Sequence, residues 1–76
     1  MAEVRVPKFG PSTVEVEVIE VFASSGQSIT EGDSIVEIES EKATMIVEAP
    51  GDGTVVEICV SVGDICEIGA LICIID

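Results

Sequence analysis

Apolar and polar side chains alternate along much of this chain with a period of two residues. The alternation is clearest over residues 13–22. The apolar positions there, which would share one buried face, are Val14, Val16 and Val18. Such a pattern is typical of a β-strand that is buried on one side. Ile19 directly follows Val18 and breaks the period, which indicates a β-bulge near residues 18–20.

Several other short segments show the same alternation or a nearly continuous apolar run between turn residues. Besides residues 13–22, the predicted strands are residues 3–6, 34–39, 44–49, 54–60 and 71–75, with a short extended segment around residues 28–30. Residues 7–12 contain two prolines and a glycine and are predicted to form a loop. The pattern therefore predicts seven or eight short strands with regular turns.

The chain also contains two copies of one pattern. Gly26 and Gly32 recur 37 residues later as Gly63 and Gly69, and an apolar pair follows the second glycine of each copy. We therefore expect an all-β fold in which two small antiparallel sheets, related by a pseudo-twofold axis, form a flattened barrel or sandwich around one core. Residues 1–76 are expected to form a single domain.

The composition argues against several classes of partner and activity. The net charge is −12, from 15 acidic against 3 basic residues, so we expect neither nucleic acid nor an anionic membrane surface as a partner. The N-terminal residues show no signal-peptide pattern, and no apolar run is long enough to span a bilayer, so we expect a cytoplasmic protein. The chain has no histidine, and no nucleophile–base set is visible, so we expect no catalytic residues.

The three cysteines are Cys59, Cys66 and Cys73. Their odd number and even spacing do not suggest a disulfide framework, and the spacing does not fit a zinc site. All three fall on apolar positions of the first copy. We therefore expect them to pack as small apolar side chains, and we expect no metal site.

A lysine lies at the join between the two copies. Lys42 is one of only two lysines, and the loop Ser40–Ala43 connects two strands that alternate on both sides. We expect a hairpin with a type I turn, which exposes Lys42 at its tip beside Glu39 and Glu41. Taken alone, such a lysine is usually an ordinary solvated turn residue.

The chain resembles the lipoyl domains of dihydrolipoamide acyltransferases from 2-oxo acid dehydrogenase complexes. The resemblance centres on Glu41-Lys42-Ala43, although Asp is commoner than Glu before the lysine in that family. It extends over essentially the whole chain. The other matching positions are Val6-Pro7, Gly26, Gly32, Glu48-Ala49-Pro50, Gly53 and the stretch from Val60 to Asp64. The ending, residues 69–76, is most similar to lipoyl domains of bacterial pyruvate dehydrogenase complexes.

The resemblance implies a covalent cofactor and a set of partners. Lys42 would carry lipoic acid in amide linkage, attached by a lipoate ligase or lipoyl transferase that recognises Glu41 and Ala43. The carrier would be a non-catalytic, monomeric domain in the bacterial cytoplasm. Its partners would be a thiamin-diphosphate-dependent 2-oxo acid dehydrogenase, the acyltransferase catalytic domain and dihydrolipoamide dehydrogenase. Pyruvate is the expected 2-oxo acid.

The loop before the second strand is a further candidate for partner recognition. In lipoyl domains this loop lies beside the lysine turn and helps the dehydrogenase to distinguish its own domain. The residues concerned are Lys8, Phe9, Gly10, Pro11 and Ser12. A plain connecting loop is the alternative.

Two other functions remain open on the residues alone. A biotinyl carrier domain of a carboxylase has the same fold and a hairpin lysine, but methionine flanks that lysine on both sides, where this chain has Glu41 and Ala43. An unmodified acidic interaction module would leave Lys42 as a free amine.

Overall fold

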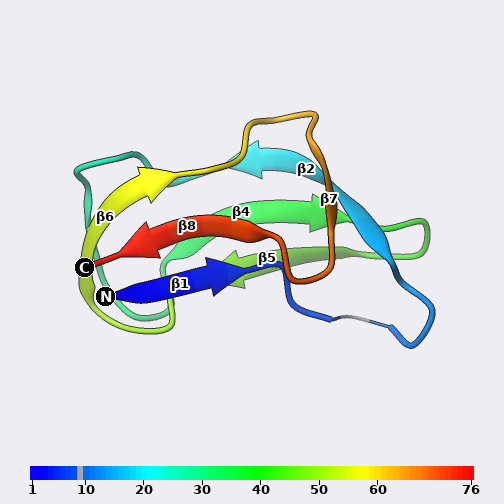
Figure 1. Cartoon of the computed structure of the whole chain (residues 1–76), viewed down its shortest axis with the longest axis horizontal. Helices are drawn as coiled ribbons and strands as arrows, with labels where there is room; N and C mark the ends of the chain where they lie inside the picture. The colour runs from blue at the N-terminus through cyan, green and yellow to red at the C-terminus, as the bar shows by residue number, and fades with distance from the viewer. Residues whose placement is uncertain (9) are drawn as a thin grey trace.

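The computed structural model describes residues 1–8 and 10–76, and these residues contain eight β-strands (Figure 1). In chain order the strands are β1 (Ala2–Arg5), β2 (Glu15–Val21), β3 (Ser28–Ile29), β4 (Ser34–Glu39), β5 (Thr44–Glu48), β6 (Gly53–Ile58), β7 (Ile65–Glu67) and β8 (Leu71–Ile75). Within this described part of the chain, no helix is long and apolar enough to cross a membrane.

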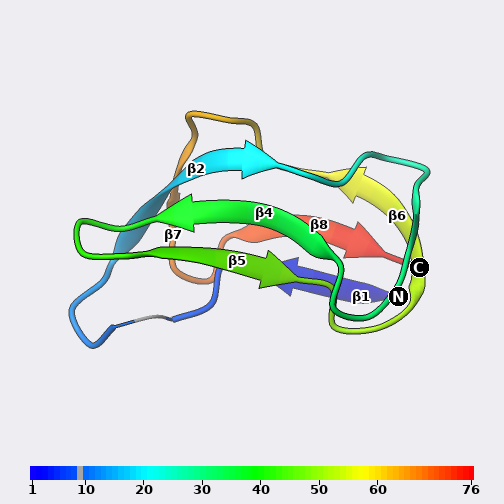
Figure 2. The same cartoon turned by 180° about the vertical axis from the view of Figure 1, so that it is seen from behind.

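The strands form two four-stranded antiparallel sheets, in the orders β1-β8-β6-β3 and β5-β4-β2-β7. Figures 1 and 2 show them as two layers, with β1 and β8 nearer the viewer in one view and β4 and β5 nearer in the other. The prediction of an all-β fold built from two small antiparallel sheets is confirmed.

The two copies of the sequence repeat exchange their short strands. Strand β3 of the first copy pairs with β6 of the second, and β7 of the second copy pairs with β2 of the first. Strand β1 lies beside β8 as β5 lies beside β4. The amide of Gly32 donates to Ala49 O at 2.9 Å, and that of Gly69 donates to Val6 O at the same distance. Both glycines have a positive φ, near +90°, that disfavours other residues.

The core is aliphatic and follows the repeat. Six pairs of buried residues occupy equivalent positions in the two copies: Val18 and Val55, Ala23 and Val60, Ile29 and Cys66, Ile35 and Ile72, Val36 and Cys73, and Ile38 and Ile75. No polar or charged side chain of the described residues is buried. One continuous core therefore lies between the sheets, which suits β-branched side chains on pleated surfaces.

Of two predictions made for strand β2, one is confirmed and one is wrong. The bulge is confirmed, because the β2–β4 register shifts between Val18 and Glu20. The prediction that Val14 shares the buried face of Val16 and Val18 is wrong. Strand β2 begins at Glu15, and Val14 lies before it with 73% of its surface exposed. The alternation in the sequence begins before the regular strand does, and at that point the Val14 side chain is not covered by the other sheet.

The prediction that all three cysteines pack as apolar side chains is wrong for one of them. Cys66 and Cys73 are buried, whereas Cys59 is exposed. Its equivalent in the first copy, Phe22, is also exposed. Apolar character at this repeat position therefore does not indicate burial, because both residues directly follow the regular part of a strand.

The lysine turn and the chain termini lie at opposite ends of the molecule. Strand β1 pairs with β8 from Ala2 opposite Ile75, which brings the two termini together. The β4–β5 hairpin ends at the other end of the long axis, which measures 33 Å (Figure 1). The fold therefore holds residues 40–43 on two long, paired strands, well away from both termini.

Candidate functional site

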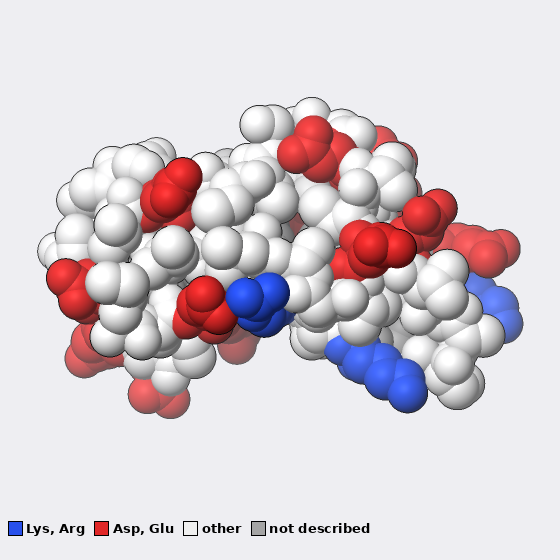
Figure 3. All heavy atoms as spheres, viewed as in Figure 1, with Lys and Arg blue, Asp and Glu red and all other residues white. Residues whose placement is uncertain are grey.

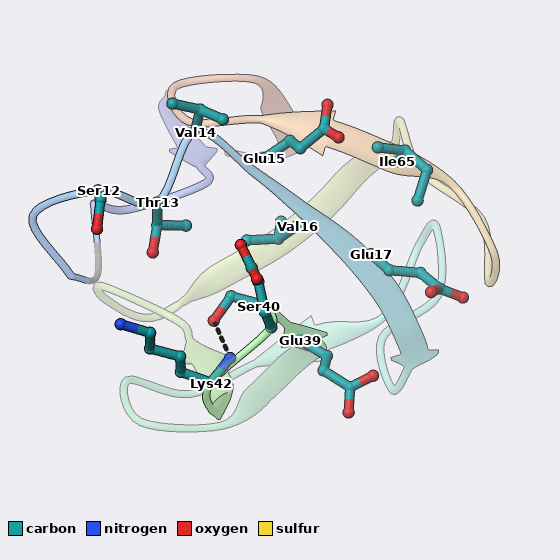
Figure 4. Close-up of a pocket in the computed structure, with 11 residues that line it drawn as sticks. Ser12, Thr13, Val14, Glu15, Val16, Glu17, Glu39, Ser40, Lys42 and Ile65 are labelled. Carbon is teal, nitrogen blue, oxygen red and sulfur yellow. Dashed lines mark hydrogen bonds between the residues drawn. The ribbon is translucent and has the colours of Figure 1, made fainter.

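The loop from Ser40 to Ala43 is a tight, hydrogen-bonded turn. Glu39 and Thr44 are the last paired residues of β4 and β5. Beyond them, the Ser40 amide donates to Ala43 O at 2.9 Å, and the Ser40 hydroxyl donates to the same oxygen at 3.3 Å. The Lys42 amide donates to Ser40 Oγ at 3.5 Å, a long contact shown in Figure 4. Ser40 therefore ties both ends of the turn together beneath the lysine.

The turn geometry agrees only in part with a type I turn. Within the described residues, positive φ occurs only at glycines, so Glu41 and Lys42 have the φ sign that type I requires. The closing hydrogen bond, however, is donated by Ser40 and accepted by Ala43, which is opposite to the direction in a type I turn. The outcome for exposure is as predicted, because Glu41, Lys42 and Ala43 are all exposed.

In the part of the chain that the structure describes, the Lys42 ammonium group has no ion-pair partner. Within residues 1–8 and 10–76, the only salt bridge joins Arg5 to Glu3, at 2.8 Å and on the other sheet. Lys42 therefore extends from a hydrogen-bonded turn with its side chain exposed. An exposed amine on a hydrogen-bonded turn is accessible to an enzyme that forms an amide bond with it.

Lys42 borders a groove of about 410 Å³ between the turn and the beginning of β2 (Figure 4). The lining residues are Ser12, Thr13, Val14, Glu15, Val16, Glu17, Glu39, Ser40, Glu41, Lys42 and Ile65. Four of them are carboxylates, and Lys42 is the single cation. Apart from Ser40, Glu41 and Lys42, most of the lining comes from β2 and the residues just before it.

The predicted recognition loop contributes one described residue, Ser12, to the lining of this groove. Ser12 lines the groove together with Lys42, so the end of the loop lies beside the lysine turn as expected from the resemblance. Lys8, Gly10 and Pro11 are exposed but do not line the groove. Phe9 lies outside the described residues. Whether the loop recognises a partner stays a prediction.

The sheet that carries Lys42 has an acidic outer face. Three cross-strand pairs place carboxylates directly opposite one another: Glu15 with Glu67, Glu17 with Glu39, and Glu20 with Glu37. In the other sheet, Glu57 faces Ile74 instead of another acid. Carboxylates are also scattered over the face seen in Figure 3, among few basic groups. Opposed like charges destabilise a sheet. These three glutamate pairs therefore lower the stability of the sheet that carries Lys42.

The two buried thiols, Cys66 and Cys73, are expected to react slowly. Burial, and then the nearby Asp64 carboxylate, raise the pKa of Cys66. Burial, and then Cys59, raise the pKa of Cys73. Both therefore stay protonated at neutral pH, which disfavours reaction and metal binding. Within the described residues, no group of three or more His, Cys, Asp or Glu side chains is arranged to hold a metal ion.

Sequence reasoning found the lysine turn but missed most of the groove. Ile65 reaches it only because β7 of the second copy pairs with β2 of the first, where Ile65 faces Glu17. Val14, predicted on the buried face of β2, instead lines the groove. An isolated apolar residue before a strand gives no signal that it lines a groove, whereas the Glu39–Glu41 cluster was visible in the sequence.

Known proteins with similar sequences and structures carry this fold. The biotin–lipoyl family, described as "Biotin-requiring enzyme", matches residues 2–75. The dihydrolipoyllysine-residue acetyltransferase component of the pyruvate dehydrogenase complex from Cupriavidus necator is 43% identical over 97% of this chain. The chain spans only 13% of that relative's length.

Two solved structures are similar to this chain over nearly its full length. The lipoyl domain of the 2-oxoglutarate dehydrogenase complex from Azotobacter vinelandii superposes with a TM-score of 0.82 and 28% identity, covering 100% of this chain and 96% of that one. The urea carboxylase of Kluyveromyces lactis has a TM-score of 0.75 and 28% identity, covering 99% of this chain but 7% of its own length. The chain therefore belongs to the biotin–lipoyl family, as a lipoyl-type carrier domain of the kind found in 2-oxo acid dehydrogenase acyltransferases.

Proposed function

We propose that Lys42 is the attachment site of lipoic acid and that this domain carries acyl groups on the modified lysine. The observation that carries the proposal is an exposed lysine at the tip of a hydrogen-bonded hairpin, with no ion-pair partner among the described residues, in a chain of this family. When bound, the lipoyl group supplies a dithiolane that accepts and releases acyl groups. The protein supplies position: Ser40 fixes the turn, and the paired strands β4 and β5 hold it at one end of the domain.

The site fits a covalently attached neutral arm. The Lys42 amine is exposed, and the adjoining groove has room for a group of small-molecule size, since such sites measure about 300–1,000 Å³. Glu41 and Ala43 are exposed on either side of the lysine, where a modifying ligase would contact them. The residue types at these two positions favour lipoylation over biotinylation, because biotinyl domains have methionine at both.

The attachment site can be tested by intact mass after co-expression with lipoate ligase or with biotin ligase. We expect a gain of one lipoyl group with the first and no gain with the second. Lys42→Arg should abolish the gain, and Lys8→Arg, which alters the only other lysine, should leave it unchanged. A biotin-sized gain would assign the domain to carboxylases. An unmodified chain beside a fully labelled reference lipoyl domain would favour the acidic interaction module.

We further propose that the domain serves a pyruvate dehydrogenase complex in the bacterial cytoplasm. Support comes from the acetyltransferase component of the pyruvate dehydrogenase complex of Cupriavidus necator. Its identity to this chain is 43%, against 28% for each of the two solved structures described above. The partners would be a lipoate ligase or lipoyl transferase, a thiamin-diphosphate-dependent dehydrogenase, an acyltransferase catalytic domain and dihydrolipoamide dehydrogenase. Tethering to such a complex raises the local concentration of the arm at each active site.

The choice of complex is tested by reductive acylation of the lipoylated domain. We expect a pyruvate dehydrogenase from a related bacterium to acylate it with a higher kcat/KM than a 2-oxoglutarate dehydrogenase does. Ser12→Ala and Pro11→Ala test whether the loop before β2 contributes to that preference, because both residues are exposed and outside the core. Equal kcat/KM values for the two dehydrogenases would contradict the assignment to pyruvate.

A further inference from the structure

Two apolar side chains are exposed in the groove beside Lys42. Val14 is 73% exposed and Ile65 is 60% exposed, and both line the groove together with the lysine. Val14 directly precedes β2, whereas Ile65 belongs to β7 and lies opposite Glu17 in the β2–β7 pairing, so the two residues line separate parts of the groove. Exposed apolar residues that line one concave site next to an exposed lysine differ from scattered surface residues, which need no explanation.

We propose that the lipoyl arm, once attached to Lys42, rests in this groove with its hydrocarbon chain against Val14 and Ile65. The inference rests on the proposed function, because it requires the arm on Lys42. The occupant is fixed by the covalent link: the Lys42 side chain already forms one wall of the groove. Figure 4 shows it extended on the side of Ser12 and Thr13, with Val14 next along the chain.

Modification changes the interaction that holds the Lys42 side chain at the groove from ionic attraction to apolar contact. Before modification, the Lys42 ammonium is attracted to the carboxylates that line the groove, Glu15, Glu17, Glu39 and Glu41. Amide formation removes the positive charge and adds an apolar chain. The modified side chain no longer has a charge that the carboxylates attract, and its hydrocarbon chain loses water-exposed apolar area by covering the two apolar residues. Docking thus depends on the hydrocarbon and not on charge.

The test compares three forms of the domain, each with its mass verified: unmodified, Nε-acetylated at Lys42, and lipoylated at Lys42. Acetylation removes the charge without adding the hydrocarbon chain. With methyl-labelled Val and Ile, we expect nuclear Overhauser contacts between the arm's methylene protons and the methyl groups of Val14 and Ile65 in the lipoylated form. The acetylated form should lack the methyl shifts that accompany these contacts.

Variants separate docking from general effects of the surface. Val14→Thr and Ile65→Thr should each lose most of the contacts. Val62→Thr should retain them, because Val62 is similarly exposed, at 64%, but does not line the groove. Equal methyl shifts in the acetylated and lipoylated forms, or an arm with no contacts to either residue, would overturn the inference while leaving the carrier function intact. Failure to lipoylate Lys42 at all would overturn both.

Discussion

The opposed carboxylate pairs of the lysine-bearing sheet lead to a quantitative prediction about stability, and the sequence repeat supplies a matched control variant. Glu20 and Glu57 are equivalent positions of the two copies. Glu20 lies opposite Glu37 in the lysine-bearing sheet, whereas Glu57 lies opposite Ile74 in the other. Glu20→Lys and Glu57→Lys change the net charge of −12 by the same amount, so the difference between the two variants isolates the local cross-strand pair.

The expected difference follows from the separation of opposed side chains. Two charges about 6 Å apart interact by about 0.7 kcal/mol in water, and reversing one of them changes repulsion into attraction. After partial screening, Glu20→Lys should be more stable than Glu57→Lys by about 1 kcal/mol. For a domain of this size, that corresponds to a Tm higher by about 4–8 °C. The assay is thermal unfolding followed by circular dichroism at low ionic strength.

Two further results decide whether the reasoning holds. At 1 M NaCl the Debye length falls to about 3 Å, so the difference in Tm between the two variants should nearly vanish. The double variant Glu20→Lys with Glu37→Lys restores a like-charged pair and should lose the advantage of Glu20→Lys. Equal Tm values at low salt, or a difference that persists at 1 M NaCl, would refute the electrostatic explanation.

The remaining predictions concern packing and the thiols. Gly53→Ala should destabilise the fold by about 1–3 kcal/mol in urea unfolding, because the new methyl group would lie 2.7 and 2.8 Å from atoms of the last two residues, whereas Gly51→Ala meets open space and should be nearly neutral. A thiol reagent should label Cys59 rapidly, and Cys66 and Cys73 only on unfolding, as followed by mass. Because the folded-state pKa values of Cys66 and Cys73 are raised above 9.0, the stability that they contribute is full below pH 9 and should decline as the pH rises further; Cys73→Val should reduce that decline in Tm.

The sequence was sufficient to predict the features that depend on local pattern. The alternation, the turn glycines and the repeat predicted seven of the eight strands, the β2 bulge and the lysine hairpin, but they did not predict β7. The exchange of β3 and β7 between the copies was not predictable, because the short segments around Ile29 and Cys66 carry no signal of which strand they pair with. The groove depends on that exchange and on where β2 begins, so Val14 and Ile65 could not be assigned from the sequence.

The central claim is that Lys42 is the residue that carries the acyl group, and the most direct test locates that group on the chain. The lipoylated domain would be incubated with a pyruvate dehydrogenase and isotope-labelled pyruvate, digested, and sequenced by fragment-ion mass spectrometry. The account predicts a labelled acyl group on the lipoyl arm of the Lys42 peptide, with the Lys8 peptide unmodified. A label at Lys8 or at a cysteine, or a fully lipoylated Lys42 that never acquires the label, would contradict it.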